Sequence, residues 1–286
     1  MANPIGYHVM CRLTDDRVIA PTTRTRRVVA ATVLEKCRGY RLLCFNAVDT
    51  HIHLNVGENR QVSGELARRI EIAVHYRLGL PVPFAPPKFK AIDSQRYLRT
   101  CFDYVLNQQP HHGLEWDPYR EASNLPDLLG LRPLGLYTVQ TIRQMLPRIG
   151  REHLLTHFGI EALAEADGPP EQIIAAALSA AALPALAGRG PRVRAVRRAV
   201  VEIGQAELSL TRLARMLGVS RQTLHRDLRV PVDGQLVGAI RLQLGLRQAV
   251  AAAAFSSFSR SLGSQKRQVS AAAAAWRSTE ITGVGR

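Results

Sequence analysis

Several features that mark common protein classes are missing from this sequence. No stretch approaches the roughly 20 uninterrupted apolar residues of a membrane-spanning helix, and the opening MANPIGYHVMCRLTDD lacks the charged start and apolar run of a secretory signal peptide. The 4 cysteines form no Cys-x-x-Cys pair. Because they fall inside expected strands and helices, we expect buried thiols in a reducing compartment, not a disulfide or zinc framework. No internal repeat is visible. These absences predict a cytoplasmic protein.

Acidic residues are also scarce. The chain has 23 Asp and Glu against 38 Lys and Arg, a net charge of +15 and a pI near 10.6. Such a charge favours a polyanionic partner, because Lys and Arg release counterions from phosphates, and most of the excess is arginine, which binds a phosphate with two parallel hydrogen bonds. Membrane-surface and ribosomal proteins share this charge. At 286 residues and 46% hydrophobic, the chain is long enough for a sizeable core and about two domains.

Strand and helix patterns alternate through residues 1–113. Their order, βαββαβα, predicts an α+β domain with a ferredoxin-like antiparallel sheet. The expected elements are a strand at 5–13, a helix at 25–37 ending before Gly39, strands at 40–48 and 51–56 in a tight hairpin, a helix capped by Ser63 and ending at Gly79, a strand at 88–92, and a helix capped by Asp93 or Ser94 that runs to about Gln109.

The rest of the chain has a different character. Residues 114–136 hold prolines, glycines and aromatics and are expected to form a connector. Residues 137–250 are alanine-rich with helical spacing, which predicts an all-α domain. Residues 251–286 are low in complexity and predict a disordered tail.

The segment THIHLNV holds two histidines two residues apart. On a strand, alternate residues face the same side, so His51 and His53 point together while Ile52 and Leu54 point to the other side, into the core. Two converging imidazoles offer two nitrogen ligands to a divalent metal. The pattern is short, and two ordinary histidines on an exposed strand face produce it equally well.

Tyr104 and Gln108 lie four residues apart in the expected helix before residue 110 and therefore share a helix face. A tyrosine hydroxyl becomes an effective nucleophile toward a phosphodiester when a metal polarises the ester and stabilises the leaving oxygen. Gln108 offers a carbonyl oxygen that suits a hard ion such as Mg²⁺ or Mn²⁺. A packing role is the alternative for Tyr104.

The segments YHVMCR, AVDTHIHLNV and YVLNQ, in this order within residues 5–112, resemble the single-tyrosine HUH transposases. That family includes the transposases of small insertion sequences and the tyrosine transposases associated with repetitive extragenic palindromes. The resemblance implies that His51, His53 and Gln108 bind the metal and that Tyr104 is the nucleophile. It also implies cleavage and rejoining of hairpin-bearing single-stranded DNA through a 5′-phosphotyrosine intermediate.

Two features depart from the family. The long helical half is additional, and the paired His111 and His112 follow the tyrosine helix, where they are an alternative third ligand, a DNA contact or a solvated loop. The residues do not decide whether Tyr104 acts on the metal site of its own subunit or on that of a partner in a homodimer. Rival hypotheses are an HUH replication initiator or relaxase, and a DNA-binding regulator that has lost catalysis.

Residues 208–228, LSLTRLARMLGVSRQTLHRDL, read as two short helices around Gly218, a pattern that resembles bacterial helix-turn-helix segments. Ser220 would cap a recognition helix that contacts duplex DNA. The residues expected to contact base edges are Arg221, Gln222, Thr223, His225 and Arg226, and the basic residues expected to contact phosphates are Arg194, Arg197 and Arg198. An ordinary pair of packed helices is the alternative.

Overall fold

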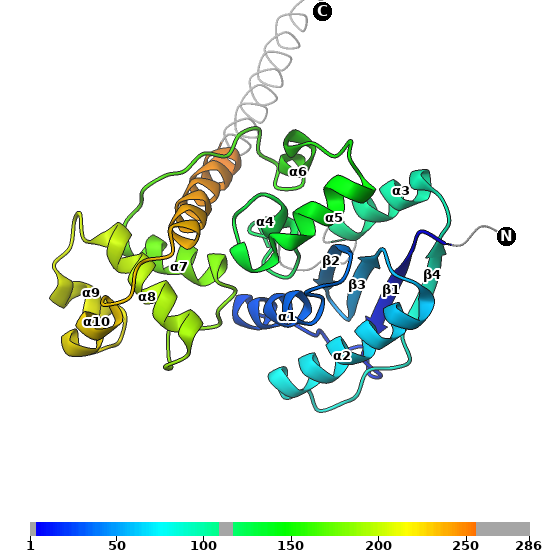
Figure 1. The fold of residues 1–286 in the computed structure, drawn as a ribbon, viewed down its shortest axis with the longest axis horizontal. Helices are drawn as coiled ribbons and strands as arrows, with labels where there is room; N and C mark the ends of the chain where they lie inside the picture. The colour runs from blue at the N-terminus through cyan, green and yellow to red at the C-terminus, as the bar shows by residue number, and fades with distance from the viewer. Residues whose placement is uncertain (1–3, 109–116, 256–286) are drawn as a thin grey trace, which may run out of the picture.

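The computed structural model describes residues 4–108 and 117–255. Its first half is built on a four-stranded antiparallel sheet in the strand order β2-β3-β1-β4 (Figure 1). The elements follow one another as β1 (Gly6–Arg12), α1 (Thr23–Lys36), β2 (Leu42–Val48), β3 (His51–Val56), α2 (Arg60–Leu78), β4 (Lys88–Ile92) and α3 (Gln95–Leu106). The βαββαβα order is therefore the one that the sequence predicts.

Local signals explain where these elements begin and end, with two corrections to the expected boundaries. Gly79 ends α2 in the left-handed conformation, at φ 60°, and Ser94 caps α3, both as expected. Ser63 does not cap α2: the helix begins one turn earlier, because the side chain of Asn59 accepts from the backbone N–H of Val62 at 2.9 Å. Helix α3 ends at Leu106, short of the expected Gln109.

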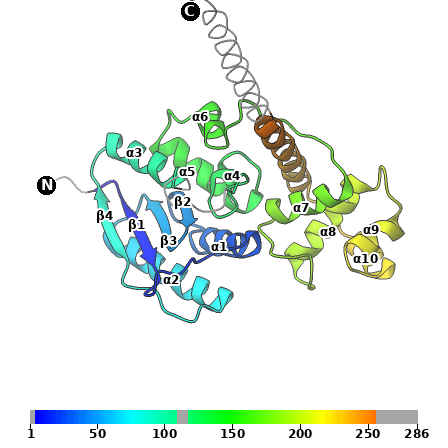
Figure 2. The same ribbon diagram turned by 180° about the vertical axis from the view of Figure 1, so that it is seen from behind.

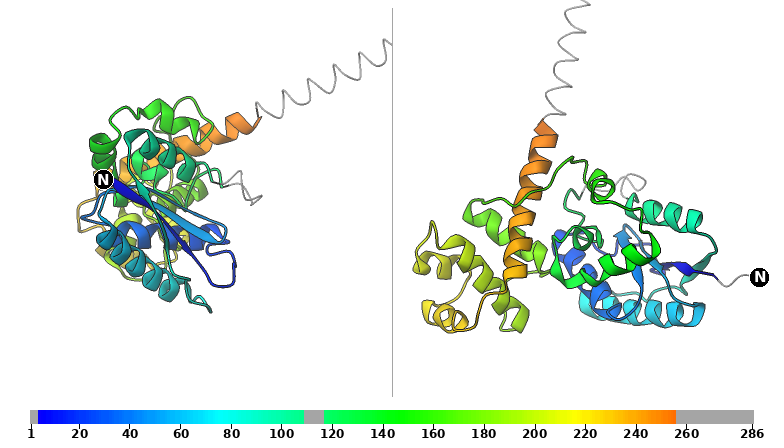
Figure 3. Two further views of the ribbon diagram at one scale, coloured as in Figure 1. Left: turned by 90° about the vertical axis from the view of Figure 1, so that its right-hand side faces the viewer. Right: turned by 45° about the horizontal axis from the view of Figure 1, so that its top comes forward.

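Helices cover both faces of the sheet (Figures 1 and 3). The first face packs against α1 and α2, as alternation in the strands requires. The buried residues of this layer include Val9, Cys11, Leu34, Ile52, Leu54, Leu66 and Ile70. The second face packs against α3 and later segments of the chain. The buried residues of that layer include Leu43, Cys44, Phe102, Val105, Leu128, Ile142 and Leu246.

The segment that was expected to be a connector is among the most buried parts of the protein. Within residues 117–136, Asn124 is fully buried and bonds β2 twice, accepting from the backbone N–H of Phe45 at 3.0 Å and donating to the carbonyl of Leu43 at 3.0 Å. Asp127 and Arg132 form an ion pair with no exposed side-chain surface. The prolines and glycines of this segment shape a tightly packed loop and not a linker.

The short helices that follow also belong to the second face of the sheet. They are α4 (Leu125–Leu128), the 3-10 helix η2 (Pro133–Gly135), α5 (Tyr137–Met145) and α6 (Arg151–Thr156). Gly135 allows this packing, since a Cβ there would lie 2.3 Å from Oδ1 of Asp127 and 2.6 Å from Cδ2 of Leu34. The expected all-α domain from residue 137 therefore contributes its first helices to the layer over the sheet.

The remaining helices form a separate cluster beside the sheet (Figure 2). They are α7 (Pro170–Ala180), α8 (Pro191–Gly204), α9 (Leu210–Met216) and α10 (Arg221–Asp227), followed by helical residues 234–255. This last helix lies between the two parts: Ile240 and Leu244 pack in the helical core, whereas Leu246 packs in the core on the second face of the sheet.

A buried polar network links the sheet to the helical cluster. Arg27 of α1 donates to Oε1 of Glu121 at 2.8 Å and to Oγ of Ser179 in α7 at 3.0 Å. Arg247, in the last helix, donates to the same Ser179 hydroxyl at 2.8 Å, and its guanidinium lies 4.3 Å from the ring centre of Tyr119. Glu121 is 1% exposed, so its charge is stabilised by these partners and not by water.

Two expectations about the chain as a whole are tested by the described ranges. Cys11, Cys37, Cys44 and Cys101 are all buried, free thiols, as the sequence predicts. No helix within residues 4–108 and 117–255 is both long and apolar enough to cross a membrane. His111, His112 and most of the 251–286 tail lie outside the described residues.

Neutralising Glu121 tests the importance of the buried network. We expect Glu121→Gln to lower the free energy of unfolding by about 3–5 kcal/mol, because it leaves buried guanidinium groups without their counter-charge. The matched control is Glu65→Gln, since Glu65 forms a half-exposed pair with Arg69 and such pairs contribute about 0–1 kcal/mol. Urea denaturation of both variants measures the difference. Equal effects would show that the network contributes no more than a surface pair.

Candidate functional site

The sheet brings the two histidines of β3 together on its second face. His51 pairs in register with Arg12 and His53 with Met10 of β1. Their ring centroids are 5.7 Å apart. Ile52 lies on the opposite face, in the core under α1 and α2. The side-chain alternation predicted from the sequence is thus observed.

His53 does not lie on an exposed face, however. It is 4% exposed, because α3 packs over this side of the sheet; the amide of Asn46 in β2 donates to the carbonyl of Val105 in α3 at 3.0 Å. His51, at the start of the strand, is half-buried. The alternative of two ordinary histidines on an exposed strand face is therefore wrong for His53, and the helix that covers it starts more than 40 residues later in the sequence.

A third histidine joins the pair. His8 of β1 lies with its Nε2 3.1 Å from Nδ1 of His53, and the two rings are stacked at 5.3 Å. Burial, and secondly the charge of Lys90, lower the pKa of His8 to about 4, so it is neutral at pH 7. His8 is not among the residues predicted from the histidine motif. The signal was present, because alternation in β1 puts His8 on the face opposite Val9.

Tyr104 lies beside these rings. It sits on α3 with 48% of its surface exposed, and its ring centre is 5.9 Å from that of His8 and 6.0 Å from that of His53, edge-on to both. A packing tyrosine would be covered by its neighbours. The exposed ring is reachable from solvent while it contacts the histidine cluster.

Gln108 lies near Tyr104, but not on a shared helix face as predicted. Because α3 ends at Leu106, Gln108 lies beyond the C-cap residue Asn107 and shares no helix face with Tyr104. Instead its side-chain amide folds back and donates to the backbone carbonyl of Tyr104 at 3.0 Å. Gln108 is 2% exposed. Its nitrogen thus holds the side chain against the last turn of α3.

The contacts of the histidines agree with a metal-binding role. Nδ1 of His51 lies 2.8 Å from the hydroxyl of Thr50, and Nδ1 of His53 faces His8. Metal-binding imidazoles commonly hold one nitrogen in such a bond while the other coordinates. The donor set of two imidazoles with the Gln108 amide oxygen fits a divalent cation.

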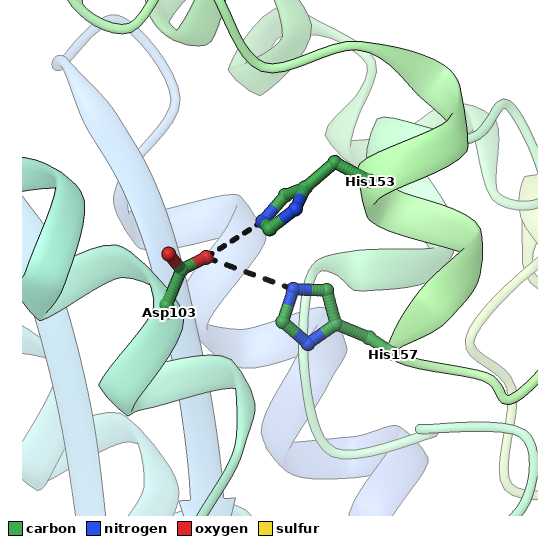
Figure 4. Close-up of side chains that lie close together, drawn as sticks. All are labelled: Asp103, His153 and His157. Carbon is green, nitrogen blue, oxygen red and sulfur yellow. Dashed lines mark hydrogen bonds and ion pairs between the residues drawn. The ribbon is translucent and has the colours of Figure 1, made fainter.

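A second group of side chains that can bind a metal lies between α3 and α6. Asp103 of α3, His153 of α6 and His157 just after α6 place one ligand atom each within 4.8 Å of the others (Figure 4). In residues 4–108 and 117–255, no other three His, Cys, Asp or Glu side chains bring their ligand atoms this close together. No sequence motif indicates this group, because the carboxylate and the histidines are about 50 residues apart.

The helix-turn-helix candidate folds as two short helices. Ser220 caps α10 as predicted, accepting from the backbone N–H of Thr223 at 3.1 Å. Leu213 and Leu224 are buried in the helical core. Of the expected base-contacting residues, four are exposed and Thr223 is half-buried; the exposed ones are Arg221, Gln222, His225 and Arg226. Gln222, Thr223, His225 and Arg226 line, with Arg229, a hollow of about 380 Å³.

The basic residues of α8 do not all face outward. Arg194 is exposed and Arg198 is half-buried. Arg197 is 4% exposed, donates to the carbonyls of Leu186 and Gly188 at 2.8 and 3.0 Å, and lies 3.7 Å from Asp227 of α10. The prediction of a phosphate contact by Arg197 is therefore wrong, because this guanidinium links α8 to α10 inside the protein.

No protein-family model matches the chain, and no curated protein matches it. Among solved structures, a REP-associated tyrosine transposase bound to a REP hairpin is similar over 39% of this chain and 70% of that chain. The sequence identity is 17% and the TM-score is 0.34.

The different burial of the two β3 histidines predicts different stability effects. His53→Ala should lower the free energy of unfolding by about 1–3 kcal/mol, because it opens a cavity at a buried position and removes the partner of Nε2 of the half-buried His8. His51→Ala, at the half-buried strand end, should change it by about 0.5 kcal/mol or less. Urea denaturation of the two variants is the measurement. Small and equal changes would mean that α3 does not cover His53.

Proposed function

We infer that the chain cleaves and rejoins single-stranded DNA, using Tyr104 as nucleophile beside a divalent metal held by His51, His53 and Gln108. The observation that carries this proposal is the half-exposed ring of Tyr104 set edge-on against His8 and the buried His53. The βαββαβα order of elements and the strand order β2-β3-β1-β4 support our interpretation of residues 4–108 as a ferredoxin-like HUH domain. A cytoplasmic location with access to DNA is expected.

The chemistry follows from the groups present. The Tyr104 oxygen forms a bond to phosphorus, the bond from phosphorus to the 3′ oxygen breaks, and the hydroxyl proton ends on that oxygen. The products are a 5′-phosphotyrosine and a free 3′-OH, and rejoining is the reverse. Mg²⁺ or Mn²⁺, when bound, polarises the phosphodiester and stabilises the leaving oxygen. His8 holds the ring of His53, and the Gln108 amide is anchored on the backbone carbonyl of Tyr104.

The helical cluster supports a second role within the same activity. Exposed Arg221, Gln222 and Arg226 on α10 are side chains that read guanine and adenine edges in the major groove. The net charge of +15 favours a phosphate-rich partner. We propose that α9 and α10 contact duplex DNA and help to select the site. Site selection combined with cleavage and rejoining of single strands is the activity of a transposase. A replication initiator or relaxase would share the cleavage step, and an inactive regulator would bind DNA without cleaving it.

Removing the Tyr104 hydroxyl tests the cleavage step. We expect Tyr104→Phe to abolish the covalent protein–DNA adduct formed with labelled hairpin-bearing single strands and Mg²⁺ or Mn²⁺, while DNA binding is retained. Tyr76→Phe is the matched control, since Tyr76 is 86% exposed on α2; its adduct yield should equal that of the unaltered protein. An undiminished yield in Tyr104→Phe would overturn the nucleophile. Binding without an adduct in the unaltered protein would favour the regulator.

The two kinds of basic residue in the helical cluster should behave differently. On a duplex selected from random sequences, Arg221→Ala should cost about 1–3 kcal/mol and relax sequence preference, because it removes a base contact. Arg194→Ala should weaken binding to selected and scrambled duplexes alike. It should also reduce the slope of log K against log salt concentration by about one unit, because one phosphate contact is lost. Titrations at several salt concentrations measure both effects. Equal losses on both duplexes for Arg221→Ala would make α10 a packing element.

A further inference from the structure

We propose that Asp103, His153 and His157 form a second metal site, for Zn²⁺ or a similar transition-metal ion, that joins α3 to α6 beside Tyr104. This site is separate from the pair in β3 and uses none of its residues. The proposal does not depend on the cleavage activity, because its tests measure metal binding. Asp103 directly precedes Tyr104, and consecutive helix residues point about 100° apart, so the two side chains of α3 serve different sites.

The three side chains converge on one point (Figure 4). His153 and His157 are four residues apart at the end of α6 and therefore lie on one side of it. Their rings are perpendicular, at 88°, and both present Nε2 to Oδ1 of Asp103, at 2.7 Å from His153 and 3.8 Å from His157. Two ligand atoms of a tetrahedral zinc ion lie roughly 3.4 Å apart. The observed separations bracket that value.

His157 supplies the observation that calls for a cation. Its side chain is 3% exposed, and Nε2 is a buried nitrogen without a hydrogen-bond partner. Its other nitrogen, Nδ1, is 2.9 Å from Oδ1 of Asn107. An amide oxygen only accepts, so Nδ1 carries the proton and Nε2 of the neutral ring carries the lone pair.

A lone pair and a carboxylate oxygen thus face each other across 3.8 Å in a buried setting. A metal ion between the two atoms would satisfy both. The Asn107 contact is also the kind of outer bond that orients a metal-binding imidazole. Two imidazoles with one carboxylate are a common ligand set of Zn²⁺.

Arg99 is the group that competes with such an ion. It donates from Nε to Oδ2 of Asp103 at 3.0 Å, and its Nη2 lies 3.1 Å from Nε2 of His153. Its side chain is 35% exposed, so it can rotate toward solvent when an ion binds at Oδ1. Asp103 and His153 are about one-third exposed, which gives the ion a path from solvent. Removing the Arg99 charge should therefore strengthen metal binding.

The test is titration of the metal-free full chain with Zn²⁺ by calorimetry and with Co²⁺ by visible absorption. All variants carry His51→Ala, so that the β3 pair does not contribute. We expect one bound ion in this background. It should be lost in Asp103→Asn and in His157→Ala, weakened about 10–100-fold in Asn107→Ala, and strengthened in Arg99→Gln. His225→Ala, at an exposed histidine of α10, and Tyr104→Phe are controls that should bind as the background does.

Asp103→Asn keeps the test decisive if His157→Ala fails to fold, because Asp103 is partly exposed and the change preserves its shape. Zn²⁺ should also raise the thermal unfolding temperature of the background protein and not that of Asp103→Asn. Binding that is unchanged in Asp103→Asn, or no bound ion in the background protein, would overturn the site. Ligand variants that lose the ion while Asn107→Ala and Arg99→Gln have no effect would overturn the account of the His157 tautomer and of the competing arginine.

Discussion

The placement of the two halves of the protein depends on the charge of one buried carboxylate. Glu121 accepts from Arg27 of α1, and the hydroxyl of Ser179 lies between this pair and Arg247 of the last helix. These groups come from four segments that are far apart in the sequence. Buried ions of this kind are tolerated only when their partners are in place, so the network disfavours other arrangements of the helical cluster against the sheet.

Some of the candidate site follows from the sequence alone, because it depends on local periodicity. Alternation in β3 places His51 and His53 on one side. The same alternation in β1 contains the information for His8. Long-range packing determines the remainder. No local signal shows that α3 covers His53, or that Asn124 and Asp127 belong to a buried loop against β2 and not to a linker.

The ends of helices explain the other differences. The sequence predicts that helix α3 continues to about Gln109, and the first proline or glycine after its cap Ser94 is Pro110. It ends at Leu106, and this places Asn107 and Gln108 outside the helix, where the first bonds His157 and the second bonds back to Tyr104. The burial of Arg197 is likewise not visible in the local sequence. A run of arginines predicts a solvated face, but the carbonyls that bind one of them lie on the preceding loop.

The last helix has a consequence for the order in which the chain folds during synthesis. Leu246 is fully buried and belongs to the same hydrophobic core as Leu43 of β2 and Phe102 of α3, although about 200 residues separate it from β2. The ribosome releases the first half long before this leucine emerges. A domain can complete its core only when all the residues of that core are available. The core on the second face of the sheet therefore stays incomplete, with apolar surface exposed, until residue 246 leaves the exit tunnel.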